Sequence, residues 1–94
     1  MLMLSKRIYE FRTSFGWTQV QLAQKLGVTK QTVSNWENEN IQPSIEMLVR
    51  IAKLFHTSTD YLLGLDNAPT INVADLPAPF IAHLVQIIEA YKHK

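Results

Sequence analysis

The 94-residue sequence has no cysteine, which excludes disulfide bonds and thiolate zinc sites. It also has no apolar run near the roughly 20 residues that a membrane-spanning helix needs. The opening MLMLSKR has too short an apolar run for a signal-peptide core, so we expect a cytoplasmic protein that does not use a membrane. The length allows one domain with a short appendage and leaves little room for an enzyme cleft.

Histidine and glycine are scarce, with three of each. His56, His83 and His93 are scattered along the chain and form no i, i+4 pair, so we expect no metal site. No phosphate-cradling glycine loop and no Ser-His-Asp set appears in the sequence. We therefore expect neither an enzyme nor a bound cofactor.

Charge is sparse as well: charged residues make up 18% of the chain, and the formal net charge is +1. Residues 1–40 carry five Lys or Arg against three Asp or Glu, whereas residues 64–94 carry two against three. The front of the chain is therefore slightly basic. This balance is too weak to indicate a nucleic-acid partner, so such a partner has to be inferred from a motif.

What the sequence does contain is a series of short helical patterns. Leu4, Ile8, Phe11 and Phe15 recur at helical spacing, and the next residue is a glycine. TQVQ at residues 18–21 matches the capping box at the start of a second helix. Further helices are expected after the capping residue types Thr29, Ser44 and Ser58, with stops at Gly27 and Gly64. No segment alternates with the period of a strand, so the predicted class is all-α.

Residues 65–79 contain three prolines and are predicted to form a linker or arm. A last helix is expected over residues 80–94. Its apolar side chains cover an arc of about 160°, against the ~100° that a helix docked on one body needs. The excess favours a dimer interface over membrane binding. The predicted interface consists of Phe80, Ile81, Leu84, Ile87, Ile88 and Tyr91.

Residues 18–36 combine a capped helix, a tight turn and a second short helix, which is the order of a helix-turn-helix. Ala23 is small where the two helices would cross, and Gly27 accepts a turn conformation that is costly for other residues. Val33 and Trp36 would hold the second helix against the body. The spacing A-x3-G-x5-V-x2-W is far more specific than any one of these residues.

The segment TQVQLAQKLGVTKQTVSNWEN, followed by P-S and by STDYLLG, resembles the phage-repressor and Cro-type (xenobiotic-response-element type) helix-turn-helix regulators. The resemblance covers about residues 4–64. It implies a five-helix repressor-like DNA-binding domain over residues 1–64, usually dimeric on a two-fold symmetric operator. The proline-containing linker and the C-terminal helix would follow this domain.

Within this resemblance, the outward face of the second motif helix gains a chemical interpretation. Its amides, ammonium group and methyl group suit base edges in the major groove, and the helix starts suit phosphates. The same polar side chains could instead be solvated, and the threonines could be caps alone. The expected base contacts are Lys30, Gln31, Thr32 and Asn35, and the expected phosphate contacts are Gln19, Thr29, Ser34 and Asn38.

The resemblance also implies that Arg12 and Glu37 form a structural ion pair, which would keep the carboxylate from repelling DNA. In the turn that follows the second motif helix, the family commonly has Gly and then a basic residue, but here Glu39 and Asn40 occupy those positions. One phosphate anchor of the family is therefore missing. We expect modest affinity per domain and a need for dimerisation.

Together these features predict a sequence-specific regulator that binds double-stranded DNA, most simply as a homodimeric repressor. Two other functions remain open from the sequence. The protein could be the antitoxin of a toxin–antitoxin pair, or an adaptor that keeps the fold without its DNA function. In either case residues 65–94 would bind a protein partner.

Overall fold

The computed structural model describes residues 3–93, and within that range every regular element is a helix. The predicted all-α class is therefore confirmed. The helices are α1 (Met3–Ser14), α2 (Gln19–Leu26), α3 (Lys30–Glu37), α4 (Ile45–Leu54), α5 (Thr59–Leu63) and α6 (Ala78–Lys92). None of these helices is long and apolar enough to cross a membrane.

Four helices begin where the sequence placed a capping side chain. The Thr18 hydroxyl accepts from the Gln21 N–H at 3.1 Å, and the Gln21 side chain accepts from the Thr18 N–H at 2.8 Å, which completes a capping box. Thr29, Ser44 and Ser58 cap α3, α4 and α5 in the same way, each through its hydroxyl. Because such caps satisfy backbone donors locally, they were readable from the sequence.

A single core holds α1 to α5 together. Its most deeply buried side chains come from all five of these helices, so none of these short helices is stable by itself. Ile8, Leu22, Val33, Ile51 and Leu62 are completely buried. Phe55 adds an aromatic cluster, with ring centroids 5.1 Å from Phe11, 5.2 Å from Phe15 and 5.8 Å from Trp17.

Predicted boundaries of the first and last helices were wrong by one or two residues. The first helix ends at Ser14 rather than Phe15, because the chain turns at Gly16, whose φ is +75°. The last helix ends at Lys92 rather than at residue 94, which lies outside the described residues. It begins at Ala78 rather than Phe80. Pro79 is the reason: a proline in the first turn lacks an N–H that would have no partner there in any case.

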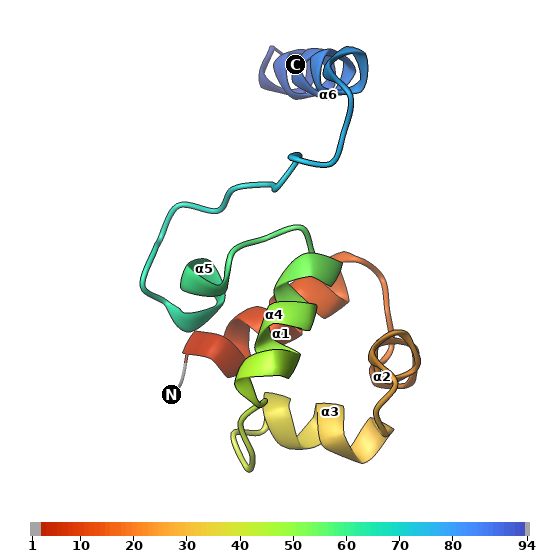
Figure 1. The fold of residues 1–94 in the computed structure, drawn as a ribbon, viewed down its shortest axis with the longest axis vertical. Helices are drawn as coiled ribbons and strands as arrows, with labels where there is room; N and C mark the ends of the chain where they lie inside the picture. The colour runs from red at the N-terminus through yellow and green to blue at the C-terminus, as the bar shows by residue number, and fades with distance from the viewer. Residues whose placement is uncertain (1–2, 94) are drawn as a thin grey trace.

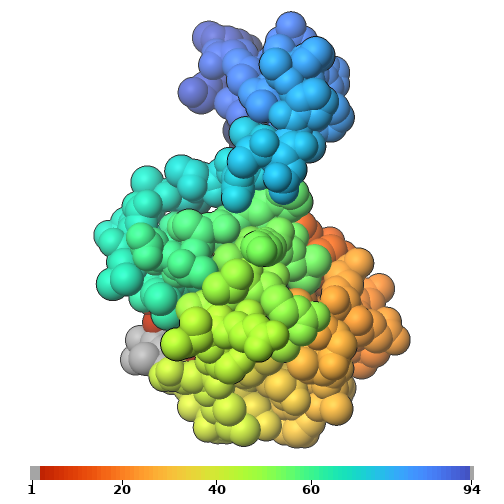
Figure 2. Space-filling view, viewed as in Figure 1, coloured from red at the N-terminus to blue at the C-terminus, as the bar shows by residue number. Residues whose placement is uncertain are grey.

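Residues 65–77, called the arm from here on, connect the domain to α6 (Figure 1). The helix α6 stands at the opposite end of the molecule from α3, and the molecule measures 41 × 26 × 25 Å. In Figure 2 the arm lies along the surface of the domain, and α6 projects beyond it. No residue of α6 is buried, so its apolar face is open.

Candidate nucleic-acid interface

Residues 19–37 form two short helices around a tight turn. At the end of α2, Gly27 adopts the left-handed conformation with φ +70° and donates its N–H to the carbonyl of Ala23. Ala23 is 3% exposed, and its small side chain lets α3 pack closely against α2. Val33 and Trp36 point into the core, so the side of α3 that carries Lys30 and Gln31 lies toward solvent.

Two of the residues expected to contact bases are bonded to each other on this outward face. Gln31 Nε2 donates to Asn35 Oδ1 at 3.0 Å, one helical turn apart. Asn40, just beyond the helix, brings its Nδ2 to 3.5 Å from the same oxygen. The amides therefore form a joined polar surface. Lys30 and Gln31 are exposed, whereas Thr32 and Asn35 are half-buried.

Some of the residues expected to contact phosphate already form hydrogen bonds with neighbouring side chains or backbone groups of α3. The Thr29 hydroxyl accepts from the Thr32 N–H at 3.1 Å and lies 2.9 Å from the Thr32 hydroxyl. Asn38 Nδ2 donates to Ser34 Oγ at 3.2 Å. Thr29 is thus a helix cap, and the first backbone N–H groups of α3 remain directed outward at its positive end.

The structure places Arg12 of α1 and Glu37 of α3 in a bidentate ion pair. Arg12 Nε lies 2.6 Å from Glu37 Oε2, and Nη2 lies 3.0 Å from Oε1. The side chains are only 13% and 7% exposed. The hydrogen bond with Glu37 raises the pKa of Arg12, although burial opposes this effect, so the guanidinium stays charged wherever the protein is folded.

Gln19 takes part in this pair, which the sequence reading missed. Its Nε2 donates to Glu37 Oε1 at 3.1 Å, so one N–H of the residue expected at a phosphate is already used within the protein. Its position at the start of α2 was the only signal available from the sequence. The acidic residue at the end of α3 is therefore neutralised by Arg12 and held by Gln19.

Arg7 is a second residue that sequence reading missed. It lies on the apolar stripe of α1, three residues after Leu4, and is 8% exposed. Its Nη1 donates to the carbonyl oxygens of Tyr61 and Asp66, the latter at 2.9 Å. A basic residue at an inward position was a signal that a buried partner exists.

Among residues 3–93, no three His, Cys, Asp or Glu side chains gather where they could hold a metal ion. The interface consists instead of amides, hydroxyls and one ammonium group on α3, whose opposite side is held against the core by Val33 and Trp36. Two short capped helices that pack across each other and are joined by a tight turn at a glycine define a helix-turn-helix protein.

Comparison with known proteins agrees with this assignment. The family model described as "Helix-turn-helix" matches residues 8–62, which is more than half of the sequence. The chain belongs to this family, and the resemblance to phage-repressor and Cro-type regulators is confirmed.

The HTH-type transcriptional regulator ImmR of Bacillus subtilis is 36% identical over 83 residues, covering 88% of this chain and 65% of ImmR. The chain thus spans slightly less than two thirds of that relative. The P22 c2 repressor, solved with a synthetic operator, has a TM-score of 0.64 at 33% identity and covers 70% of this chain and 98% of its own. A transcriptional regulator from Listeria innocua shares the fold alone, with a TM-score of 0.63 at 23% identity over 96% of this chain and 92% of its own.

Proposed function

We propose that the protein is a sequence-specific regulator of transcription that binds double-stranded DNA and acts as a dimeric repressor in the cytoplasm. The observation that carries this proposal is the outward face of α3. There the Gln31 and Asn35 side chains are hydrogen-bonded to each other, and the Glu37 carboxylate is neutralised by Arg12. Support comes from the P22 c2 repressor, which was solved with an operator, and from the transcription regulators among the relatives. These relatives also favour a regulator over an enzyme.

In this proposal α3 enters the major groove and its outward side chains read bases. Gln31 and Asn35 present amides that suit the hydrogen-bonding edge of adenine, and Lys30 suits the acceptors of guanine. The Thr32 methyl group would contact that of thymine. Because Val33 and Trp36 fix the opposite face, the reading side chains are presented in one orientation.

The phosphate contacts would set the register of the protein on the duplex. Thr29 would contribute mainly through the backbone at the start of α3, since its hydroxyl already caps that helix. Gln19 keeps one amide N–H beyond its bond to Glu37. Ser34 and Asn38 would approach the backbone together as a bonded pair.

We further propose that α6 forms the dimer interface. Its apolar side chains are open: Phe80 is 49% exposed, Ile88 46% and Tyr91 73%. Pairing with a second α6 would remove this surface from water. Ile81, Leu84 and Ile87 would lie in the same contact, and the two copies of α3 would reach half-sites about one helical turn apart, ~34–36 Å.

Selection from a randomised duplex library at about 150 mM salt, where nonspecific attraction is largely suppressed, tests the DNA function. A two-fold symmetric motif is expected. Gln31→Ala should relax the preference at one base position in each half-site by roughly 1–3 kcal/mol. Gln24→Ala, at an exposed glutamine on α2, is the control and should leave the motif unchanged. No enrichment by folded protein would refute the proposal and favour an adaptor.

Sedimentation of the full chain tests the interface. Ile88→Asp places a charge within the apolar face and should convert the dimer to a monomer. Gln86→Asp adds the same charge on the opposite side of α6 and should have no effect. If both variants sediment like the original protein, α6 is not the interface. In that case binding of a protein partner through residues 65–94, as in an antitoxin, becomes the favoured alternative.

A further inference from the structure

The arm, expected from its prolines to be a linker, is attached to the domain at both ends of a seven-residue stretch. The first attachment is Arg7, which donates to the carbonyl of Asp66 at 2.9 Å and to that of Tyr61. Its guanidinium lies 3.7 Å from the centre of the Tyr61 ring. Leu65 adds a backbone bond to Asp60 at 2.9 Å. The arm therefore leaves α5 in a direction that a buried charge fixes.

The second attachment is a two-bond pairing between His56 and Asn72. The Asn72 N–H donates to the His56 carbonyl at 2.8 Å, and His56 Nδ1 lies 3.2 Å from the Asn72 carbonyl. Because a carbonyl can only accept, Nδ1 carries the proton. His56 has φ +54°, an uncommon conformation for a residue with a side chain, and this conformation presents its carbonyl to the arm.

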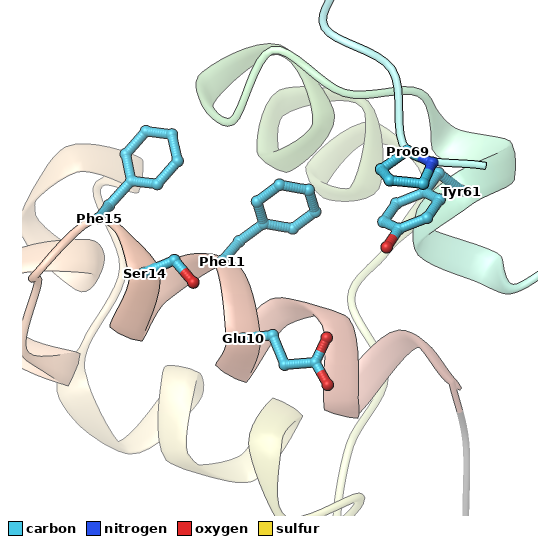
Figure 3. Close-up of a pocket in the computed structure, with 6 residues that line it drawn as sticks. All are labelled: Glu10, Phe11, Ser14, Phe15, Tyr61 and Pro69. Atoms are coloured by element: carbon cyan, nitrogen blue, oxygen red, sulfur yellow. The ribbon is translucent and has the colours of Figure 1, made fainter. Parts of the chain in front are cut away.

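Between the two attachments the arm crosses the aromatic cluster of the core. Pro69 lines a groove of about 250 Å³ together with Phe11, Phe15 and Tyr61 (Figure 3). A second groove of about 520 Å³ adds Ile71 beside the same phenylalanines. Ile71 remains 66% exposed, so this contact is loose. The hydrogen bonds at Asp66 and Asn72, rather than tight packing, therefore determine the course of the arm.

The attachments shorten the free length between the domain and α6. If all 13 residues of the arm were free, they could reach about 45 Å, whereas the five residues after Asn72 reach only about 17 Å. Part of that remainder is folded as well. The Ala74 N–H donates to Asn72 Oδ1 at 3.0 Å, and the Leu76 N–H donates to the Val73 carbonyl at 3.0 Å.

We propose that residues 66–72 are a fixed spacer that makes the protein selective for the distance between two operator half-sites, with Asn72 and His56 as the residues that determine this selectivity. The inference rests on the proposed function, since it requires a dimer joined through α6. In each copy α3 lies at the end of the molecule remote from α6 (Figure 1). In a dimer joined through α6, the path of the arm would therefore set the separation of the two reading helices. A free arm would accept many separations.

The test uses duplexes with two half-sites of the selected motif separated by 0 to about 12 base pairs, each base pair adding ~3.4 Å of helix axis. The original dimer should prefer one separation by roughly tenfold over those a few base pairs away. Asn72→Pro removes the N–H that bonds His56 together with the Oδ1 that accepts from Ala74, whereas His56→Ala removes only the bond from the imidazole to the Asn72 carbonyl. Both substitutions lie at exposed positions, and each should flatten the preference to within about threefold.

Thr70→Pro is the matched control. It places a proline in the same stretch, but the Thr70 N–H forms no hydrogen bond within residues 3–93, so the preference should persist. Equal binding of the original protein to all separations, or an unchanged preference in Asn72→Pro, would overturn the inference.

Binding to a duplex with a single half-site is measured in parallel. Intact half-site binding without spacing selectivity refutes the spacer alone, whereas loss of half-site binding by every folded variant and by the original protein refutes the proposed function and the spacer together.

Discussion

Removal of Arg12 should destabilise the domain far more than removal of an exposed ion-pair partner. In Arg12→Ala, Glu37 keeps only the hydrogen bond from Gln19 in a site where its side chain is 7% exposed. A buried charge that loses its partner costs roughly 3–5 kcal/mol. We expect about 3 kcal/mol, the lower end, because Arg12 itself keeps some contact with water and Gln19 stays in place.

The loss is measured by urea unfolding at one fixed protein concentration, because dimerisation would add stability that depends on concentration. A thermal melt is the second measurement. For a domain of this size 1 kcal/mol shifts Tm by about 4–8 °C, so Tm should decrease by ~12–24 °C. The matched control is Lys6→Ala. Lys6 and Glu10 lie 3.9 Å apart with both side chains more than half exposed, and such a pair contributes about 0–1 kcal/mol.

Replacing both partners separates the charge from the packing. The double variant Arg12→Met, Glu37→Met leaves no unpaired charge and should retain more stability than Arg12→Ala, because well-packed apolar pairs replace buried ion pairs at little cost. If the unfolding free energies of Arg12→Ala and the Lys6→Ala control differ by less than about 1 kcal/mol, Glu37 is not left as a costly unpaired charge. A double variant that is less stable than Arg12→Ala would likewise contradict a charge penalty at Glu37.

Glu39→Gly should raise the unfolding free energy by about 0.5–1 kcal/mol, because φ is +64° at this position and glycine adopts that conformation without strain; a thermal melt that falls would contradict this. Gly27→Ala and Gly64→Ala should both destabilise by roughly 1–2 kcal/mol through their positive φ. The loss should be larger at Gly64, where the new Cβ would lie 2.9 Å from Met3 Cβ, and equal urea midpoints would exclude that clash. Thr18→Ala removes half of a capping box and should cost about 1 kcal/mol, which urea unfolding can detect.

The helices of the domain were predictable because their signals are local. The caps at Thr18 and Thr29 each accept from an N–H three residues away, and the stop at Gly27 depends on its own φ. The last helix was placed two residues late because prolines were treated only as breakers. The hydrogen bonds of the arm could not be predicted, since His56 and Asn72 are brought together only by the completed fold.

For the interface, helical periodicity was enough to separate the inward Val33 and Trp36 from the outward polar side chains. It could not show which of the outward side chains bond one another. The contact between Gln31 and Asn35 depends on rotamers, and the bond from Gln19 to Glu37 depends on how α2 crosses α3. Residue types and their spacing therefore predicted which side of α3 is exposed. The hydrogen bonds among its side chains depend on the three-dimensional fold and could not be predicted.

The division of α3 into two faces bears on how proteins of this fold diverge. Val33 and Trp36 carry the attachment of the helix to the core, so Lys30 and Gln31 can be exchanged with little effect on folding, since exposed substitutions usually change stability by less than about 0.5 kcal/mol. A duplicated gene could acquire a new target sequence through a few such changes and remain folded at every step. The same architecture can therefore serve many regulators whose targets do not overlap.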